Sequence, residues 1–369
     1  MPFKSIHSRA PTRIDLAGGT VDLWPLYLFL NDPVTVNVAI DLFAEAKIEQ
    51  LPARNSEGEI LLKSEDQNLE MKVPWGALEA FLETDHIQAP PALELHFRLL
   101  RYFVQRRAEA GQKTLNFDLS LTTRARSPAG AGLGGSSTLS VAIVGALASW
   151  AGEGAESANP IDREKLVEIV RDIETTVIHV PAGVQDYYGA MFGGLQSLRW
   201  KPGSHQRSWL PTDILPELEK RLILFYSGQS RNSGINNWAL FKAFIDNQGD
   251  VRTKFDKITR AAERLDQALR AHDWEAAGSA IADEWAVRRT LAPGITTPEI
   301  DRAFEKAEKI ASIAGKVCGA GGGGCFFVYL PSADQEKRAR IEAAFVTQGI
   351  QVLPFHIAPH GLEVQVSRA

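Results

Sequence analysis

A glycine-rich run, Ser127-Pro-Ala-Gly-Ala-Gly-Leu-Gly-Gly-Ser-Ser137, leads directly into an apolar segment with the periodicity of a helix. Glycines let the backbone approach a ligand closely and turn its N–H groups inward. Ser136 and Ser137 then fall at the helix N-terminus, where free N–H groups and the helix dipole favour an anion. The run therefore predicts a phosphate-binding loop, although a plain glycine turn with serine N-caps also fits the pattern.

The spacing of this run distinguishes between two common phosphate-binding patterns. A Walker A loop has Lys before its Ser or Thr, and Gly135 stands in that position here, which disfavours a P-loop fold. Gly130, Gly132 and Gly135 match the dinucleotide pattern G-x-G-x-x-G, and the pattern recurs from Gly319 onward. No acidic residue follows at a strand end, where the ribose would need one, so a dinucleotide enzyme is kept only as an alternative.

Strand and helix patterns are mixed without the regular βαβ order of a doubly wound sheet, which predicts an α+β fold. Alternating apolar and polar residues predict strands at 34–40, 115–122 and 362–366, and an apolar run predicts a buried strand at 325–330. A helical period predicts helices at 93–110, 139–150, 163–176, 256–271, 274–290, 298–314 and 335–345.

The length of 369 residues fits two domains, each with its own core. The stretch 201–216 is rich in turn-forming residues and helices dominate after it, so we expect domains at 1–205 and 206–369.

A net charge of −5 does not indicate a surface that binds nucleic acid, and two cysteines are too few for a disulfide framework. Without an apolar leader or a stretch of the ~20 residues that a membrane span needs, we expect a cytoplasmic monomer or homodimer without membrane or nucleic-acid partners.

A second cluster, Ala10-Pro-Thr-Arg-Ile-Asp-Leu-Ala-Gly-Gly-Thr-Val-Asp22, places Arg13 and Asp22 on either side of a Gly-Gly turn. Such a turn can bring the backbone against a small substrate. An aspartate beside it can accept hydrogen bonds from sugar hydroxyls, and an arginine can neutralise charge. Taken alone, the cluster fits a surface turn with a solvated ion pair equally well.

Two acidic residues and a third glycine cluster complete the candidates. Asp186 follows the turn Val180-Pro-Ala-Gly-Val-Gln, which can hold a carboxylate rigidly, as a general base requires. Glu174 could join the Ser136 hydroxyl and phosphate oxygens around Mg²⁺, although alone it fits a solvated acid at a helix end. The third cluster, Lys316-Val-Cys-Gly-Ala-Gly-Gly-Gly-Gly-Cys325, predicts a close backbone approach, because ordering four consecutive glycines has a large entropic cost.

In this order and at these separations, the three glycine clusters resemble the motifs of the GHMP small-molecule kinases, which include galactokinase, homoserine kinase and mevalonate kinase. The resemblance spans roughly residues 8–330. It is greatest to heptose 7-phosphate kinases and fucokinase domains, through residues 9–19, Asn37-Val-Ala-Ile-Asp41, Gly183-Val-Gln-Asp-Tyr-Tyr-Gly189 and Tyr226-Ser-Gly-Gln-Ser-Arg231. The resemblance implies a ribosomal-protein-like N-terminal domain, a ferredoxin-like C-terminal domain and an active site between them.

The resemblance also implies roles for individual residues, with ATP and Mg²⁺ as cofactors. Asp186 would be the catalytic aspartate, Arg13 would orient and activate the acceptor hydroxyl, and Ser136 and Glu174 would hold the metal. The residues implied to bind the ATP phosphates are Pro128, Gly130, Ala131, Gly132, Leu133, Gly134, Gly135, Ser136 and Ser137. Those implied to bind the substrate are Gly18, Gly19, Thr20, Asp22, Gly183, Gln185, Arg231, Gly321 and Gly322, with Arg231 reserved for a substrate phosphate.

The implied reaction is transfer of the γ-phosphoryl group of ATP to a hydroxyl of a sugar or sugar phosphate, with the anomeric hydroxyl of a heptose 7-phosphate preferred. Val21 and Tyr187 depart from the residues usual in related sugar kinases, so the acceptor stays open. The alternatives are a kinase for a free sugar of the fucose, galactose or uronic acid type, a non-sugar enzyme such as mevalonate kinase, and a catalytically silent nucleotide-binding regulator.

Overall fold

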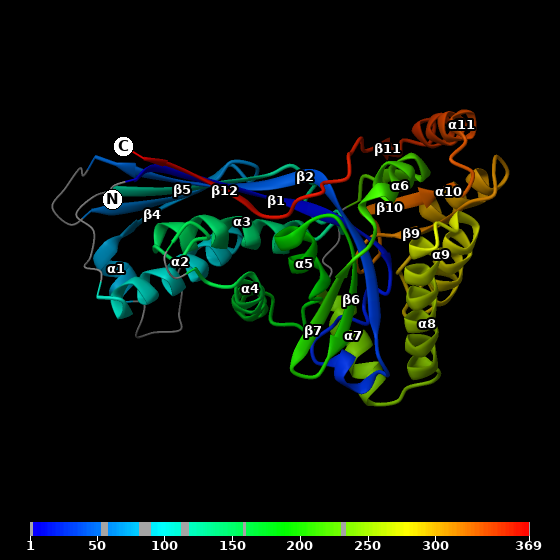
Figure 1. Ribbon diagram of the computed structural model, residues 1–369, viewed down its shortest axis with the longest axis horizontal. Helices are drawn as coiled ribbons and strands as arrows, with labels where there is room; N and C mark the ends of the chain where they lie inside the picture. Colours follow the sequence, from blue (N-terminus) through cyan, green and yellow to red (C-terminus); the bar gives the residue numbers. More distant parts are fainter. Residues whose placement is uncertain are drawn as a thin grey trace.

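The structure is a computed structural model that describes residues 3–52, 58–80, 90–111, 118–157, 160–229 and 234–368. An eight-stranded sheet with helices on one face occupies one side of the molecule, and a four-stranded sheet with its own helices occupies the other (Figure 1). The site described below lies where the two parts meet.

The eight-stranded sheet is organised around two long strands. Its members are β1 (Phe3–Ala17), β2 (Val34–Leu51), β3 (Glu59–Ser64), β4 (Leu69–Pro74), β5 (Asp118–Ala125), β6 (Leu195–Lys201), β7 (Ser204–Trp209) and β12 (Glu363–Arg368). β1 pairs antiparallel with one edge of β2. The other edge of β2 pairs with two strands in succession, β6 through residues 34–38 and β5 through residues 44–51. The strand order is β12-β1-β2-β5-β3-β4, and only β3 and β5 run parallel.

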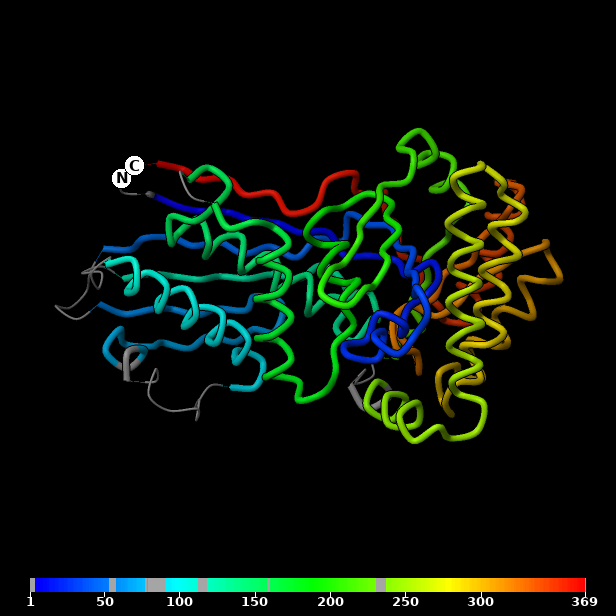
Figure 2. Tube along the Cα trace, turned by 60° about the horizontal axis from the view of Figure 1, so that its bottom comes forward, coloured from blue at the N-terminus to red at the C-terminus, as the bar shows by residue number. Residues whose placement is uncertain are grey.

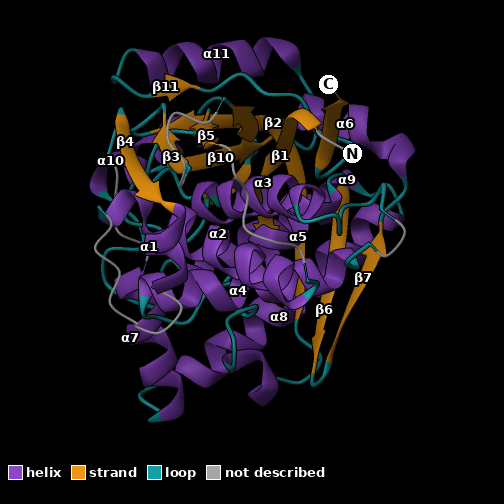
Figure 3. Ribbon diagram, turned by 90° about the vertical axis from the view of Figure 1, so that its left-hand side faces the viewer, coloured by secondary structure: helices purple, strands orange, loops and turns teal. Residues whose placement is uncertain are grey.

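Helices α1 to α5 gather on one face of this sheet (Figure 3). They are α1 (Trp75–Ala80), α2 (Pro91–Glu109), α3 (Gly135–Trp150), α4 (Arg163–Ile178) and α5 (Gln185–Phe192). α3 contacts β1 and β2 on one side and α2, α4 and α5 on the others, so it is buried almost all round. Its sequence is correspondingly apolar on every face, with small residues where neighbours come close. Burial of α3 fixes its N-terminus, and with it the preceding glycine loop.

The second part is built on an antiparallel sheet in the order β11-β8-β10-β9. Its strands are β8 (Leu222–Tyr226), β9 (Ala314–Val317), β10 (Cys325–Tyr329) and β11 (Gln351–Val352). Its helices are α6 (Leu215–Arg221), α7 (Gly234–Ile245), α8 (Val251–Arg270), α9 (Trp274–Arg288), α10 (Pro298–Glu308) and α11 (Gln335–Val346). Helices α8 and α9 pack against each other, and α9 also contacts β9. Short helical turns at Leu26–Phe29 and Thr212–Ile214 complete the fold.

The chain crosses between the two parts more than once. After β11 it returns to the first sheet, where β12 pairs antiparallel with β1, so the two ends of the chain run side by side (Figure 2). The predicted division at 205/206 falls within β7. That division remains a prediction.

The seven predicted helices and four predicted strands all appear, with shifted ends. The helix expected over 298–314 ends at Glu308, because Ala314 already begins β9, which pairs with β10. The long strand β1 is not among the predicted strands. Residues 10–22 were interpreted only through their Gly-Gly turn, and the structure shows that residues 10–17 before that turn belong to β1. The α+β prediction is confirmed, and the mostly antiparallel sheet excludes the doubly wound sheet of the dinucleotide alternative.

Candidate active site

A cavity of about 700 Å³ opens where the loop before α3, the turn after β1, the start of α5 and the loop between β9 and β10 come together. Both predicted acids, Asp186 and Glu174, line it with Arg13. The other predicted residues that line it are Thr20, Asp22, Pro128, Gly130, Ala131, Gly132, Gly134, Gly135, Ser136, Ser137, Gly183, Gln185 and Gly321. Residues from all three glycine clusters thus share one cavity.

Several predicted residues take other positions. Leu133 is buried in the core, and its carbonyl accepts a hydrogen bond from the Arg13 N–H at 3.3 Å, so it anchors the loop from behind. Gly18 shapes the turn after β1: a Cβ there would lie 2.1 Å from the Val34 carbonyl oxygen. Gly322 donates its N–H to the Ile295 carbonyl and does not line the cavity. Arg231 lies outside the described residues.

The glycine loop before α3 presents free backbone donors to the cavity. Gly130, Gly132 and Gly134 all have positive φ, between 68° and 78°, a conformation that side chains disfavour. No side chain caps α3, and its first backbone i→i−4 bond is made by the N–H of Thr138. The preceding N–H groups therefore have no partner within the helix and point at the cavity with the positive end of the dipole. This geometry suits a polyphosphate.

The same loop is pressed against the loop between β9 and β10. A Cβ on Gly132 would lie 2.5 Å from the Cys318 carbonyl oxygen, so only glycine fits. Cys325 donates its N–H to the Ala131 carbonyl at 2.7 Å. Backbone contacts between loops that have no side chains to separate them explain why the third cluster is so rich in glycine, as the sequence predicted.

Arg13, which is buried, forms an ion pair with the partly exposed Asp186 beside the glycine loop. Two guanidinium nitrogens of Arg13, Nε and Nη2, lie 2.7 and 2.5 Å from Oδ1 of Asp186, while Nη1 donates to the Gly132 carbonyl at 2.8 Å. Burial raises the pKa of Asp186, and the positive charge of Arg13 opposes that rise. Arg13 thus links Asp186, the predicted catalytic aspartate, to the loop in front of α3.

Asp22 lies across the cavity on the turn after β1. Its Oδ2 accepts a hydrogen bond from the backbone N–H of Gln185 at 3.0 Å. A Cβ on Gly183 would lie 2.8 Å from the same oxygen, so glycine is needed for this approach. Burial and the neighbouring charge of Asp186 raise the pKa of Asp22 to about 6. The carboxylate is held ready to accept further hydrogen bonds from a ligand.

Glu174 and Ser136 supply the oxygen donors that Mg²⁺ prefers. Glu174 is buried on α4, and burial raises its pKa while the nearby hydroxyls of Ser136 and Tyr187 oppose the rise. The Tyr187 hydroxyl is buried without a hydrogen-bond partner among the described residues, as is typical of a site that is completed by a ligand. No cluster of three or more metal-ligating His, Cys, Asp or Glu exists in the described part of the chain. Two protein oxygens and phosphate oxygens would suit Mg²⁺, which retains water and seldom uses an all-protein cage.

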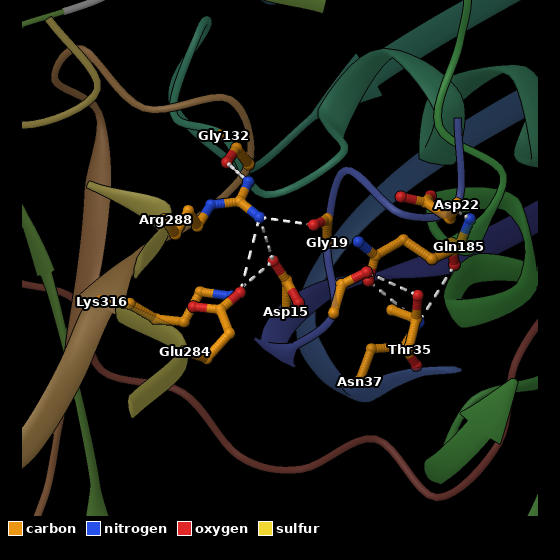
Figure 4. A network of polar contacts seen from close by, with 12 residues as sticks. Asp15, Gly19, Asp22, Thr35, Asn37, Gly132, Gln185, Glu284, Arg288 and Lys316 are labelled. Atoms are coloured by element: carbon orange, nitrogen blue, oxygen red, sulfur yellow. Dashed lines mark hydrogen bonds and ion pairs between the residues drawn. The ribbon is translucent and has the colours of Figure 1, made fainter. Parts of the chain in front are cut away.

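The structure adds a buried charge cluster that the sequence analysis missed. Arg288 lines the cavity, and Asp15 and Glu284 lie around its guanidinium group (Figure 4). Lys316 bridges the two carboxylates. One signal was available: Arg13 and Asp15 are two residues apart and share a face of β1. Nothing local could show that α9 and β9 bring the other members to them.

Comparison with known families matches both parts of the chain. The family model for the GHMP kinases N terminal domain matches residues 95–194, and the GHMP kinases C terminal model matches residues 265–349. Together the two matches span half of the chain. The chain therefore belongs to the GHMP kinase family, and the prediction of an ATP-dependent kinase is confirmed at the level of the family.

Named relatives include both sugar and non-sugar kinases. The chain is 24% identical to D-glycero-alpha-D-manno-heptose 7-phosphate kinase of Campylobacter jejuni, over 98% of this chain and 99% of that protein. It is 25% identical to the L-fucokinase/L-fucose-1-P guanylyltransferase of Bacteroides fragilis over 91% of this chain, which spans only 35% of that longer protein. It is 23% identical to the mevalonate kinase of Pyrococcus horikoshii over 85% of this chain and 88% of that protein.

Solved structures confirm the two-domain GHMP kinase fold. A D-glycero-D-manno-heptose 1-phosphate kinase from Bacteriodes thetaiotaomicron superposes with a TM-score of 0.70 at 21% identity, covering 98% of both chains. The Lin0012 protein from Listeria innocua superposes with a TM-score of 0.76 at 15% identity, covering 99% of this chain and 100% of that one. Streptococcus pneumoniae phosphomevalonate kinase, solved with phosphomevalonate and AMPPNP, has a TM-score of 0.69 at 14% identity, covering 95% and 99%. Among the described helices, none is long and apolar enough to cross a membrane.

Proposed function

We propose that this protein transfers the γ-phosphoryl group of ATP to a hydroxyl group of a sugar or sugar phosphate. The observation that carries the proposal is the position of Asp186. Arg13 holds one carboxylate oxygen of Asp186 beside the glycine loop, and Asp22 lies on the other side of the cavity. A base placed between a phosphate-binding loop and a hydroxyl-binding acid suits phosphoryl transfer to an alcohol.

The phosphates of ATP would bind at the N-terminus of α3. The free N–H groups there and the helix dipole favour the negative charge of a triphosphate. Ser136 and Glu174 would hold Mg²⁺, which would supply neutralisation of the phosphate charge. Arg13, with one nitrogen already on the Gly132 carbonyl, adds positive charge on the side where the transferred group would pass.

Asp186 would act as the general base. Both Arg13 contacts fall on Oδ1, and no hydrogen bond or ion pair from a described residue falls on Oδ2. Oδ2 faces Gly134, where an added Cβ would lie 3.0 Å from it. The acceptor hydroxyl would give its proton to Oδ2 as its oxygen bonds to the γ-phosphorus. The bond between that phosphorus and the bridging oxygen breaks, and ADP leaves with that oxygen.

Asp22 would bind hydroxyl groups of the acceptor. Its Oδ2 is engaged with the Gln185 N–H, and Oδ1 has no partner among the described residues, so it can accept from a sugar. We propose a heptose 7-phosphate as the acceptor, on the name of the Campylobacter jejuni relative, which spans nearly the whole chain. The anomeric hydroxyl as the reacting group, and Arg231 as a ligand of the substrate phosphate, come from the sequence resemblance.

The test is ADP release with MgATP across a panel of acceptors: heptose 7-phosphate, hexose phosphates, free hexoses, uronic acids, fucose, mevalonate and homoserine. Turnover confined to a phosphorylated sugar supports the heptose 7-phosphate proposal. Turnover on a free sugar alone moves the acceptor to the fucokinase or galactokinase class and removes the role of Arg231. Turnover on mevalonate alone contradicts the sugar proposal. ATP binding without turnover on any acceptor contradicts the proposal of an active kinase.

A further inference from the structure

Arg288, the last residue of α9, joins two loops of the cavity that belong to different parts of the fold. It is only 2% exposed. Its Nη1 donates to the Gly19 carbonyl at 2.6 Å, and its Nη2 donates to the Gly319 carbonyl at 2.5 Å. Gly19 belongs to the turn that carries Asp22, and Gly319 belongs to the loop between β9 and β10.

A buried cluster of charges holds the guanidinium group in this position. Lys316 Nζ donates to Asp15 Oδ2 at 2.9 Å and to Glu284 Oε1 at 2.6 Å. Arg288 Nη1 lies 3.9 Å from the same Asp15 oxygen and 3.6 Å from the same Glu284 oxygen. All four side chains are buried, and their two positive and two negative charges balance. Burial disfavours ionised Asp15, but Lys316 and Arg288 more than offset this, so the pKa of Asp15 lies below its ordinary value.

The two glycines allow the loops to meet this cluster. A Cβ on Gly19 would lie 2.1 Å from Asp15 Oδ2 and 3.0 Å from Arg288 Nη1, so any side chain would push the turn away. Gly319 has a φ of 65°, and its Cβ would lie 2.8 Å from the Gly132 carbonyl oxygen. Contacts therefore run from the acceptor-side turn through Arg288 and Gly319 to the glycine loop at the N-terminus of α3.

We propose that Arg288 is a positioning residue that sets the separation between the Asp22 turn and the phosphate-binding loop. This proposal rests on the proposed function, because it assigns the turn to the acceptor and the loop to ATP. A guanidinium group has a planar fork that reaches two carbonyls at once, whereas a lysine ammonium is a single point charge on a flexible stem. A lysine at this position would keep the charge balance but would not donate to both carbonyl groups in the same geometry.

The direct test compares Arg288→Lys and Arg288→Ala with Arg289→Ala. Arg289 is the next residue, but it is exposed and pairs with Asp301 at 2.7 Å outside the cavity. With MgATP and heptose 7-phosphate, Arg288→Lys should raise the acceptor KM and lower kcat, for a combined loss of ~10²-fold in kcat/KM, since a misplacement of ~1 Å can have that effect. MgATP affinity, measured by titration without acceptor, should stay within ~2-fold, because the donors at α3 are untouched. Arg289→Ala should match the wild-type protein.

Backbone hydrogen exchange tests whether Arg288 links the two loops, without relying on turnover. Arg288→Lys should speed exchange of the amides at 18–24 and at 319–324 together, while the core of α3 stays protected as in the wild-type protein. If no acceptor is turned over, this exchange pattern still supports the link that Arg288 makes between the two loops, while the proposed function fails. Unchanged exchange at both loops, or unchanged kcat/KM beside an active wild-type protein, overturns the proposal. Uniformly faster exchange over the whole chain also overturns it, because that result indicates a purely structural residue.

Discussion

Arg13 contacts only one of the two oxygens of the Asp186 carboxylate. Nε and Nη2 of Arg13 both lie on Oδ1, at 2.7 and 2.5 Å. The same guanidinium group donates to the Gly132 carbonyl at 2.8 Å, so the orientation of the carboxylate is set by the glycine loop. The second oxygen, Oδ2, lies toward Gly134, where the transferred phosphoryl group would be placed. The pair therefore separates two tasks: Oδ1 is used for alignment and Oδ2 is left for a proton.

Replacement of Asp186 by Asn tests that division. The amide oxygen can still accept from Arg13, but the side chain can no longer take a proton, so kcat should fall by ~10²–10⁴-fold. MgATP binding, measured by titration, should persist. Asp283→Asn is the matched control, because this acid is exposed on α9 and pairs with Arg264, and neither residue lines the cavity. Near-normal turnover in Asp186→Asn would show that another group takes the proton.

Ionisation of the buried Asp22 carboxyl group should lower the free energy of unfolding at neutral pH. Its pKa is raised from the ordinary value of 3.8 to about 6 in the folded chain, so the folded state binds the proton more tightly than the unfolded state does. Stability is therefore lost as the pH rises through that window. Asp22→Asn cannot ionise, and its free energy of unfolding should exceed that of the wild-type protein by ~1–3 kcal/mol above about pH 7 and by much less near pH 4. Urea unfolding at both pH values measures the difference, and an equal effect at both would contradict the assignment.

The same group should control acceptor binding. Below about pH 6 a protonated Asp22 accepts fewer hydrogen bonds, so the acceptor KM should rise as the pH falls through that value. MgATP affinity should change little over the same range. In Asp22→Asn the acceptor KM should be high at every pH and should lose this dependence. Retention of the same pH profile by the variant would assign the titration to a different group.

Gly183→Ala should weaken acceptor binding without strain on the backbone. Its φ is not in the positive range, but the new Cβ would lie 2.8 Å from Asp22 Oδ2. We expect the acceptor KM to rise by ~10-fold, because the carboxylate must move, while MgATP affinity is kept. Gly76→Ala is the control, since a Cβ at that position meets nothing within 4 Å. Equal kinetics in the two variants would show that Gly183 does not position Asp22.

Lys316→Met should destabilise the junction between the two parts of the fold. The change leaves the buried carboxylates of Asp15 and Glu284 without their shared partner, which typically costs ~3–5 kcal/mol. The second change Glu284→Gln in the same chain restores the charge balance with Arg288 and should recover part of the loss. Urea unfolding of the single and double variants measures both. A single variant as stable as the wild-type protein would show that the cluster does not hold the junction.

The sequence was informative where function depends on short patterns. The glycine run before α3, the turn before Asp186 and the pair Arg13 and Asp22 could each be identified locally, because backbone conformation and neighbouring residues define them. The structure brings them to one cavity. The roles assigned to them stay predictions until the variants above are measured.

Contacts between distant segments could not be predicted in this way. Arg288 reaches Gly19 across 269 residues of sequence, and Lys316 reaches Asp15 across 301. No periodicity shows that a lysine in β9 will be buried against an aspartate on β1. The strand character of β1 was hidden for a related reason, since its pairing with both β2 and β12 stabilises it, and β12 lies at the other end of the chain.

The central claim is tested most directly by following the phosphoryl group itself. Phosphorus NMR of a reaction with MgATP and heptose 7-phosphate should show ADP and a second phosphate group on the sugar appearing in equal amounts. With Asp186→Asn at the same protein concentration, both signals should grow ~10²–10⁴-fold more slowly. ADP that forms without a new sugar phosphate, or a new sugar phosphate that forms as fast with Asp186→Asn, would contradict the account.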